Sequence, residues 1–256
     1  MRLGLGLVLL AALAPPAEAS RLVTVGHSVL GRPIKAIVIG PRDAARNVLV
    51  VGSIHGNETA GHAIVAALRK RGAAPAGTAL WLVRSFNPDG VAGHTRQNAH
   101  GVDLNRQAPY RWRALPRGTF YSGPHPLSEP ESRAAIRLVR RLKPVLSIWY
   151  HQHARKVVST TPLARRYANA VGLPWGELPG TYPGSITNWE NHVFPQKVAF
   201  VVELASGALS PRAVRRHVRA VIAAARETRS AHGARRPAPA SRRWSARSPG
   251  SRRASA

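Results

Sequence analysis

The sequence contains no cysteine among its 256 residues. This absence excludes disulfide bonds, a thiolate metal site and a cysteine nucleophile. Acidic residues are also scarce, because 11 Asp and Glu stand against 38 Lys and Arg, which gives a formal net charge of +27. An acid that occurs in a motif of so basic a chain is therefore a stronger candidate for a functional role than usual.

The sequence also has no apolar run long enough to span a bilayer comfortably. Its most apolar stretch, residues 3–14, follows Arg2 and precedes a small-x-small motif at residues 17–19. This is the pattern of a secretory signal peptide, and a lipoprotein anchor would need a cysteine. We expect residues 1–19 to be removed, Ser20 to begin the mature protein, and the protein to be secreted, either periplasmic or associated with the cell wall.

The end of the chain has few residues that could enter a core. Residues 233–256 are mainly Ala, Pro, Ser and Arg, with seven Arg and no acid, so we expect a disordered tail. Residues 20–232 are then the folded domain, large enough for a sizeable core. The positive field attracts polyanions. For an exported protein, an anionic cell wall or membrane surface fits better than nucleic acid, and we expect no specific nucleic-acid binding.

Predicted strands and helices alternate along the domain. Runs rich in Val, Ile and Leu predict buried strands, and helical periodicity lies between them. Such interleaving indicates an α/β fold with covered sheet faces. Residues 87–126 show no clear element, and so long a loop is usually functional. Ser128 and Glu131 form a capping-box pattern. The predicted strands are 34–39, 48–54, 79–85, 145–151 and 198–204; the predicted helices are 59–71, 129–142, 163–171 and 211–229.

The most informative segment is Gly-Ser-Ile-His-Gly-Asn-Glu at residues 52–58, directly after an apolar run. It places His55 and Glu58 three residues apart at the carboxyl end of a strand, where ligands collect in open α/β sheets. An imidazole nitrogen and a carboxylate oxygen at this spacing can bind one Zn²⁺. The alternative is that Glu58 only stabilises the first turn of a helix through the helix dipole.

Cationic and amide side chains form a second candidate group within the long loop. Arg96 precedes the segment Gly-Val-Asp-Leu-Asn-Arg at residues 101–106. Asn105 and Arg106, together with Arg96, can clamp a carboxylate through charge-assisted hydrogen bonds. Taken singly, each arginine could equally be a solvated surface charge.

Two later strands end in or contain further candidates. His151 and His153 lie at the end of the run 145–151 and share one face, because strand side chains repeat every two residues. Glu203 lies inside the apolar run 198–204. A buried, unpaired carboxylate is costly, so Glu203 is expected to face a cation, a metal-bound water or a cleft, unless it pairs with a structural arginine.

The order and spacing of these segments resemble the zinc carboxypeptidase family, and within it the short murein peptide amidase branch. The resemblance spans residues 48–204 and implies a three-layer α/β/α sandwich with a mixed, largely parallel central sheet, and one Zn²⁺ per chain. The matching segments are His55-x-x-Glu58, Asn-Pro-Asp-Gly at residues 87–90, Arg96, residues 101–106, the strand ending in His151, and Glu203.

The same resemblance implies a role for each residue. His151 is preferred to His153 as a ligand because it directly ends the apolar run, as the family ligand does. Tyr182 lies in a Tyr-Pro-Gly-Ser-Ile segment that resembles one lining the family's pocket. The implied metal ligands are His55, Glu58 and His151; the implied catalytic residues are Arg96 for the oxyanion and Glu203 as general base and then acid; the implied substrate-binding residues are Asn105 and Arg106 for a free carboxylate, and Tyr182.

The predicted function is that of a secreted, zinc-dependent metallopeptidase that hydrolyses an amide bond next to a free carboxylate in cell-wall (murein) peptides. The γ-D-glutamyl–diaminopimelate bond is one candidate. Two alternatives of the same class are an ordinary metallocarboxypeptidase and a succinylglutamate desuccinylase-like deacylase. An alternative of another class is a non-catalytic, basic cell-wall-binding protein. The intact ligand set and Glu203 argue against the last, since a non-catalytic domain need keep neither.

Overall fold

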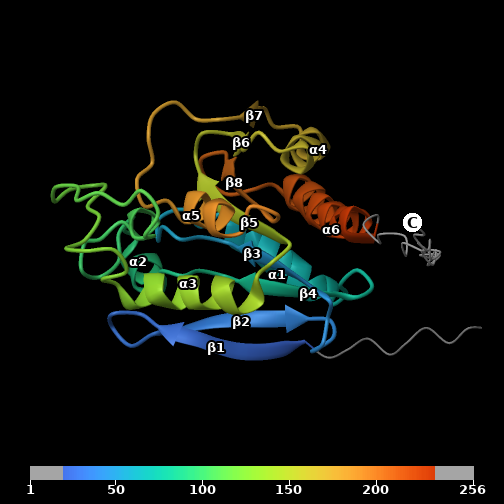
Figure 1. The fold of residues 1–256 in the computed structure, drawn as a ribbon, viewed down its shortest axis with the longest axis horizontal. Helices are drawn as coiled ribbons and strands as arrows, with labels where there is room; N and C mark the ends of the chain where they lie inside the picture. Colours follow the sequence, from blue (N-terminus) through green and yellow to red (C-terminus); the bar gives the residue numbers. More distant parts are fainter. Residues whose placement is uncertain (1–19, 234–256) are drawn as a thin grey trace, which may run out of the picture.

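The structure, a computed structural model, describes residues 20–233, so the predicted leader and residues 234–256 of the predicted tail lie outside the described residues. A mixed sheet of eight strands forms its centre (Figure 1). The strand order is β1-β2-β4-β3-β5-β8-β6-β7. The strands are β1 (Arg21–His27), β2 (Pro33–Ile39), β3 (Arg46–Val51), β4 (Thr78–Val83), β5 (Leu146–Gln152), β6 (Lys156–Val158), β7 (Trp175–Gly176) and β8 (Val198–Leu204).

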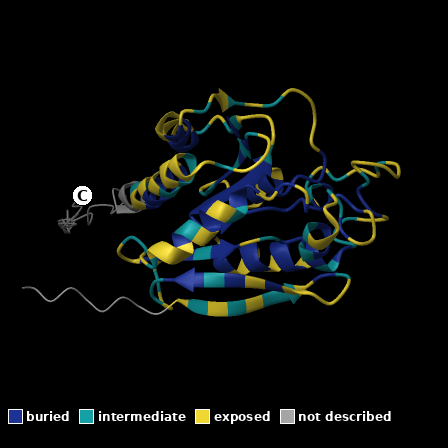
Figure 2. Ribbon diagram, turned by 180° about the vertical axis from the view of Figure 1, so that it is seen from behind, coloured by how far each residue is buried: buried dark blue, intermediate teal, exposed yellow. Residues whose placement is uncertain are grey.

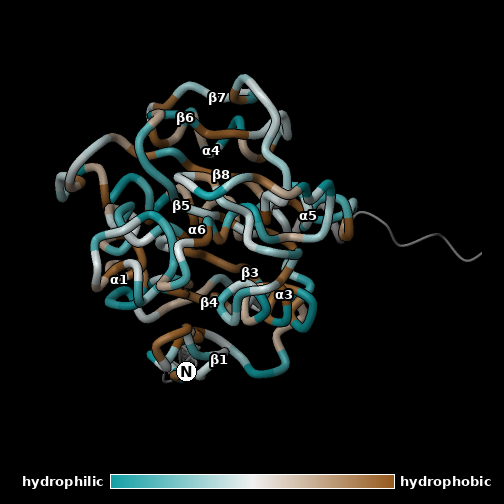
Figure 3. Tube along the Cα trace, turned by 90° about the vertical axis from the view of Figure 1, so that its left-hand side faces the viewer, coloured by the Kyte–Doolittle hydropathy of each residue, from teal (hydrophilic) through white to brown (hydrophobic). Residues whose placement is uncertain are grey.

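Helices cover both faces of this sheet. One core lies between the sheet and α1 (Gly61–Arg71), α4 (Pro162–Val171) and α6 (Pro211–Gly233). A second core lies on the other face, under α3 (Pro130–Leu142) and α5 (Ile186–Val193). Buried residues fill the central strands and the inward sides of the helices (Figure 2), and the same strands are the most hydrophobic part of the trace (Figure 3). The predicted α/β/α sandwich is confirmed.

The parallel part of the sheet consists of four adjacent strands, β4, β3, β5 and β8. The strands β1 and β2 run antiparallel to their neighbours, whereas β6 runs antiparallel to β8 and parallel to β7, so the sheet is mixed, as predicted. Because the carboxyl ends of parallel strands meet at one edge, the segments after β3, β5 and β8 are brought together there. This edge receives the candidate residues from three distant parts of the sequence.

All five predicted strands and four predicted helices are present, with small shifts at their ends. The edge strand β1, the short strands β6 and β7 and the helix α5 were not predicted. The segment 87–126 contains the short helix α2 (Pro88–Gly93) and the 3₁₀ turn η1 (Leu104–Arg106). Within residues 20–233, no helix combines the length and apolar character needed to cross a membrane.

The predicted capping box at the start of α3 is wrong. The residue that caps the helix is Glu129, and no side chain accepts a hydrogen bond from the first turn there. Ser128 Oγ instead donates to Gln107 Oε1, at 3.2 Å, and to Glu129 Oε1, at 2.7 Å. Glu131 accepts from the backbone N–H of Val29, at 2.9 Å. Tertiary partners therefore replace the local capping bonds.

A buried carboxyl group joins α5 to β5. Glu190 is 1% exposed, and it accepts hydrogen bonds from the hydroxyl of Ser147 and from Trp149 Nε1. Ser147 and Trp149 lie on the same face of β5 as His151, because strand residues alternate. Burial disfavours the charged carboxylate more than these two bonds favour it, and the pKa of Glu190 is raised to about 7.

This raised pKa predicts a specific pH dependence of stability. The folded state holds the proton of Glu190 more tightly than the unfolded chain, so its contribution is fully present at low pH. That contribution should be lost as pH rises from about 4.5 to about 7. The amide in Glu190→Gln can accept from Trp149 and donate to Ser147 without ionising. The variant should gain on the order of 3 kcal/mol over the wild type between pH 4.5 and pH 8.

Urea unfolding of both proteins across this pH range checks the prediction. The difference between the two curves isolates Glu190 from the other titrating groups, because those groups are common to both proteins. Parallel curves over the whole range would show that Glu190 does not titrate in this window.

Candidate functional site

The candidate metal ligands converge at the carboxyl edge of the parallel strands. His55 Nδ1 lies 2.8 Å from Glu58 Oε1, and His151 Nδ1 lies 2.9 Å from Glu58 Oε2. The two Nδ1 atoms are 3.2 Å apart. All three residues are buried, and their ligand atoms lie within 4.8 Å of one another. The structure thus joins the loop after β3 to the end of β5 in one cluster of donors.

Close backbone packing fixes the loop that carries two of these donors. A side chain at Gly56 would approach the backbone of Gly90 in α2 to 2.0 Å, so only glycine fits. The N–H of Gly56 donates to the carbonyl of Arg96, at 3.3 Å. Asn87, which caps α2 through the N–H of Gly90, also donates to the carbonyl of Arg96, at 3.2 Å. The Asn-Pro-Asp-Gly turn therefore supports both the His55 loop and Arg96.

The carboxylate of Asp103 lies behind the cluster and is completely buried. Its Oδ1 is 2.9 Å from His55 Nε2, and its Oδ2 accepts from Arg96 Nη2 at 3.0 Å. Burial alone would raise the pKa of Asp103, but His55 and Arg96 outweigh it and hold that pKa far below its usual range. A carboxylate on the outer nitrogen of a histidine fixes the ring orientation that a metal ligand needs.

Glu58 is held by cations and donors on both oxygens. Arg96 Nη1 donates to its Oε1 at 2.9 Å, and the N–H of Gln152 donates to its Oε2 at 3.2 Å. Burial by itself would raise the pKa of Glu58, yet the neighbouring His151 and His55 keep it well below its ordinary value. Glu58 is therefore ionised across the physiological range, as a carboxylate ligand must be.

The donor set fits zinc. Two imidazole nitrogens and one carboxylate oxygen are the ligands of many catalytic zinc sites, which keep one position open. Ligand bonds of about 2.0–2.2 Å around a tetrahedral ion place the ligand atoms roughly 3.3–3.6 Å apart, slightly more than the 2.8–3.2 Å separations found here. Small side-chain shifts would admit the ion. His55, Glu58 and His151 are the residues that would hold it.

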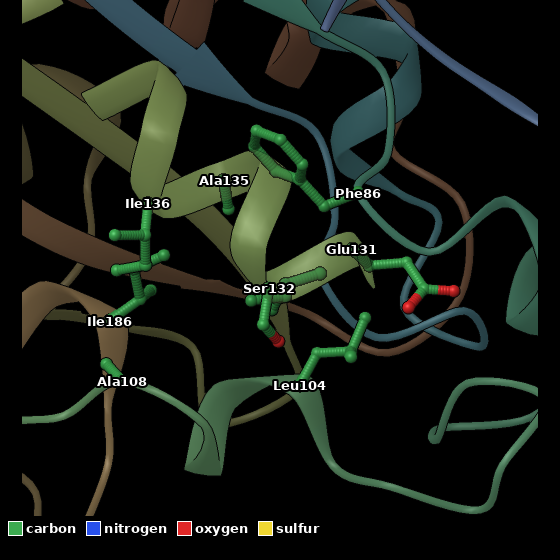
Figure 4. Close-up of a pocket in the computed structure, with 9 residues that line it drawn as sticks. Phe86, Leu104, Ala108, Glu131, Ser132, Ala135, Ile136 and Ile186 are labelled. Carbon is green, nitrogen blue, oxygen red and sulfur yellow. The ribbon is translucent and has the colours of Figure 1, made fainter. Parts of the chain in front are cut away.

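The 3₁₀ turn η1 brings Asn105 and Arg106 to the same cleft. Its start is capped by Asp103, whose Oδ1 accepts from the N–H of Asn105 at 2.9 Å. Asn105 Oδ1 accepts from the N–H of Ile186, at 3.0 Å, at the start of α5. Below the turn, Leu104 and Ile186 line a small, mainly apolar pocket against α3 (Figure 4). This packing fixes the turn from behind.

Arg106 is a buried cation without an ion pair. It is 6% exposed, and burial lowers its pKa. Its Nη1 donates to the carbonyl of Asn105 at 2.8 Å. Among residues 20–233 it makes no salt bridge, whereas Arg96 makes one with Glu58 and one with Asp103. A buried cation without an ion pair that lines a cleft is a candidate site for an anion.

These groups line one cleft of about 560 Å³. Glu203 lies on β8, the strand next to β5, in register with His151. The sequence suggested that Glu203 is buried, but the structure shows it half-buried. Its carboxylate accepts from the N–H of Ala154 at 3.3 Å. Tyr182 lies at the rim, and its hydroxyl donates to the carbonyl of Pro179 at 2.7 Å. The lining residues are His55, Glu58, Arg96, Asn105, Arg106, His151, Gln152, Val158, Leu178, Tyr182, Ser185, Thr187, Asn188, Val201 and Glu203.

The structure thus brings all eight candidate residues to this cleft, whereas His153 is exposed and lies outside the donor cluster. Sequence reasoning assigned no role to Asp103 or Gln152. Asp103 could have been found, because it is the only acid between Asp89 and Glu129 in a chain poor in acids. No signal in the sequence points to Gln152, whose N–H donates to Glu58 and whose side chain accepts from the N–H of Ala60 and donates to the carbonyls of Ala205 and Gly207.

Comparisons with known proteins agree with this geometry. A profile of the zinc carboxypeptidase family matches residues 9–167. That segment includes the three donors and the residues of the anion site, but it ends before Tyr182 and Glu203. The chain is 28% identical over 180 residues to murein peptide amidase A of Escherichia coli strain K12, covering 64% of this chain and 74% of the relative. It is 30% identical over 184 residues to the carboxypeptidase N catalytic chain of Rattus norvegicus, covering 57% and 40%.

Solved structures share the fold. The murein-tripeptide amidase of Escherichia coli O157 has a TM-score of 0.63 and 24% identity, covering 83% of this chain and 96% of that one. Bovine thrombin-activatable fibrinolysis inhibitor has a TM-score of 0.68 and 18% identity, covering 84% and 90%. Both alignments extend over most of the described residues.

The donor cluster predicts about one zinc ion per chain. His55→Ala and His151→Ala each remove a ligand and should lose the metal on dialysis. His153→Ala should keep it, because His153 is exposed and outside the cluster; it serves as the matched control. Elemental analysis of the three purified variants and the wild type measures the number of zinc ions per chain. Retention of zinc in His151→Ala, or its loss in His153→Ala, would contradict this ligand set.

Proposed function

The chain belongs to the zinc carboxypeptidase family, and from this premise we propose that it cuts the amide bond next to a free carboxylate in a cell-wall peptide. It is a hydrolase related to metallocarboxypeptidases and murein peptide amidases. The relative from Escherichia coli is named for action on murein peptides. The observation that carries the proposal is one cleft holding the donor cluster, the unpaired cation Arg106 and the carboxylate of Glu203.

The arrangement of the cleft supports a division of labour among its residues. Arg106 and Asn105 bind the terminal carboxylate of the substrate, which fixes the register of the chain and places the next amide over the donor cluster. When bound, zinc supplies a Lewis acid that polarises a carbonyl and lowers the pKa of water. Arg96, already aimed at Glu58 beside the donors, stabilises negative charge on the carbonyl oxygen, a contribution of roughly 3–4 kcal/mol for a single such donor.

Glu203 is the group proposed to move the proton. It is half-buried, lines the same cleft as His55 and Glu58, and bonds to a single backbone amide. Glu203 takes the proton of the attacking water as general base and then gives it to the leaving amine as general acid. A carboxylate can serve both steps only when it is not locked into an ion pair, and Glu203 makes none among the described residues.

We propose that the protein is exported and acts at an anionic cell wall. The predicted leader at residues 1–19 supports export. The charge distribution supports binding to an anionic wall. Residues 20–233 carry 30 Lys and Arg against 10 Asp and Glu, and six of these acids are buried. Arg106 is the only buried Lys or Arg among the side chains that the structure describes. The solvent-facing surface is therefore strongly cationic and attracts polyanions.

Glu203→Gln should reduce turnover of a carboxylate-terminated muropeptide by at least about 10²–10⁴-fold, the typical contribution of a general base. The amide keeps the size of the side chain but cannot accept the proton. Zinc content and thermal stability should stay at wild-type values, because Glu203 lies outside the donor cluster. Assays on a panel of muropeptides and ordinary peptides, with and without a chelator, measure the loss and the preferred substrate.

The panel also separates the alternatives. Cleavage of ordinary peptides alone would favour a plain carboxypeptidase, and cleavage of N-acylated amino acids would favour a deacylase. A loss smaller than about tenfold in Glu203→Gln would remove Glu203 from the mechanism. A zinc-loaded protein inactive on every substrate would favour a binding role.

Export and wall binding are tested together. Expressed with its own leader, the protein should be recovered outside the cytoplasmic membrane with Ser20 as its first residue. It should sediment with purified anionic walls at low salt and be released at higher salt, because exposed charges are screened within about 8 Å at physiological ionic strength. Deleting residues 234–256, which carry seven Arg, should weaken this binding without changing activity on small soluble peptides. If the protein stayed in the cytoplasm with its leader uncleaved, the proposal that it is exported would be wrong.

A further inference from the structure

One exposed aromatic ring lies over both arginines of the cleft. Phe120 is 52% exposed, an unusual position for so large an apolar side chain. The guanidinium carbons of Arg96 and Arg106 lie 5.2 Å and 5.3 Å from the centre of its ring. Phe120 does not line the cleft itself. It lies against the two cations that do.

The backbone on both sides of Phe120 is tied to the segments that carry these arginines. Gln97, the neighbour of Arg96, donates from its side chain to the carbonyls of Gly118 and Thr119, at 3.1 Å and 3.0 Å. The carbonyl of Tyr121 accepts from the N–H of Asp103 at 2.8 Å. The position of the ring is therefore built into the loop, and it does not depend on hydrophobic burial.

The two arginines depend on the ring to different degrees. Arg96 is held by two carboxylates, Glu58 and Asp103. Arg106 has no salt bridge among the described residues, and it is buried next to the like charge of Arg96. The faces of aromatic rings attract cations within about 6 Å, most strongly where water is excluded. The carboxylate of Asp103 attracts Arg106 without forming a salt bridge with it. Phe120 and Tyr182, whose ring centre lies 5.5 Å from the guanidinium carbon, are the two rings beside Arg106.

We propose that Phe120 is a positioning residue for carboxylate recognition. Its ring holds the Arg106 guanidinium in the orientation that accepts the terminal carboxylate of the substrate. This inference rests on the proposed function of the cleft. Because Arg96 keeps its two carboxylate partners, removal of the ring acts on substrate binding rather than on the chemical step.

The test compares Phe120→Leu with Phe120→Tyr in the zinc-loaded, full-length protein. Leucine keeps an apolar side chain of similar length but removes the ring, whereas tyrosine keeps the ring. For a peptide with a free terminal carboxylate, Phe120→Leu should raise KM about tenfold, the size of a partly desolvated cation–π contact. Its kcat should change less than about threefold, and Phe120→Tyr should behave as the wild type. Trp175→Leu, which removes another half-exposed ring stacked on an arginine, Arg165, is the matched control and should have no effect.

A binding measurement separates this inference from the proposed function. In a Glu203→Gln background, calorimetry gives the affinity for the same peptide and for its terminally amidated form. Loss of the ring should weaken binding of the carboxylate form about tenfold and leave the amidated form unchanged. Equal losses for both forms, or no loss in Phe120→Leu, would overturn the role of Phe120. A wild-type protein that does not distinguish the two forms would instead refute the carboxylate site itself.

Discussion

The buried carboxylate of Asp103 is the interaction on which the arrangement of the site depends. One of its oxygens contacts His55 Nε2 and accepts from the N–H of Asn105, and the other accepts from Arg96. A single acid therefore orients a metal ligand, holds the arginine beside the donors and begins the turn that carries Arg106. Its burial is tolerated because charge-assisted hydrogen bonds replace the lost water on both oxygens.

The scarcity of acids gives this arrangement its electrostatic character. Most of the acids in the described residues lie inside, where Glu58, Asp103 and Glu190 are the clearest examples. Their environments differ in kind. Glu58 and Asp103 lie among cations and stay ionised, whereas Glu190 has only the Ser147 hydroxyl and the Trp149 N–H, and its pKa rises to about 7. The outer surface keeps almost all of the positive charge, so the same imbalance that organises the site also defines the surface presented to partners.

The sequence predicts the central part of the fold and the ends of its strands because both depend on local patterns. The apolar runs of β3 and β5 are almost entirely buried, and that of β8 is buried on one face and half-buried on much of the other; such runs are visible without a structure. The edge strand β7 has two residues and α5 has eight, too few for a clear periodicity. The prediction of a capping box was wrong because Glu129 and Glu131 bond to residues distant in sequence, among them Asn98 and Val29. Phe120 was missed for the same reason: its partners Arg96 and Arg106 become neighbours only when the loop folds.

The two carboxylates that line the cleft differ in how tightly they are held, and this difference bears on the chemistry. Glu58 contacts His55, His151, Arg96 and the N–H of Gln152, so both of its oxygens are fully engaged. Such a group can bind a metal, but protonating it would break several charge-assisted bonds at once. Glu203 is partly solvated and accepts from one backbone amide. This difference supports the assignment, in the proposed mechanism, of proton transfer to Glu203 on β8 and of metal binding to Glu58 after β3 together with His151 on β5.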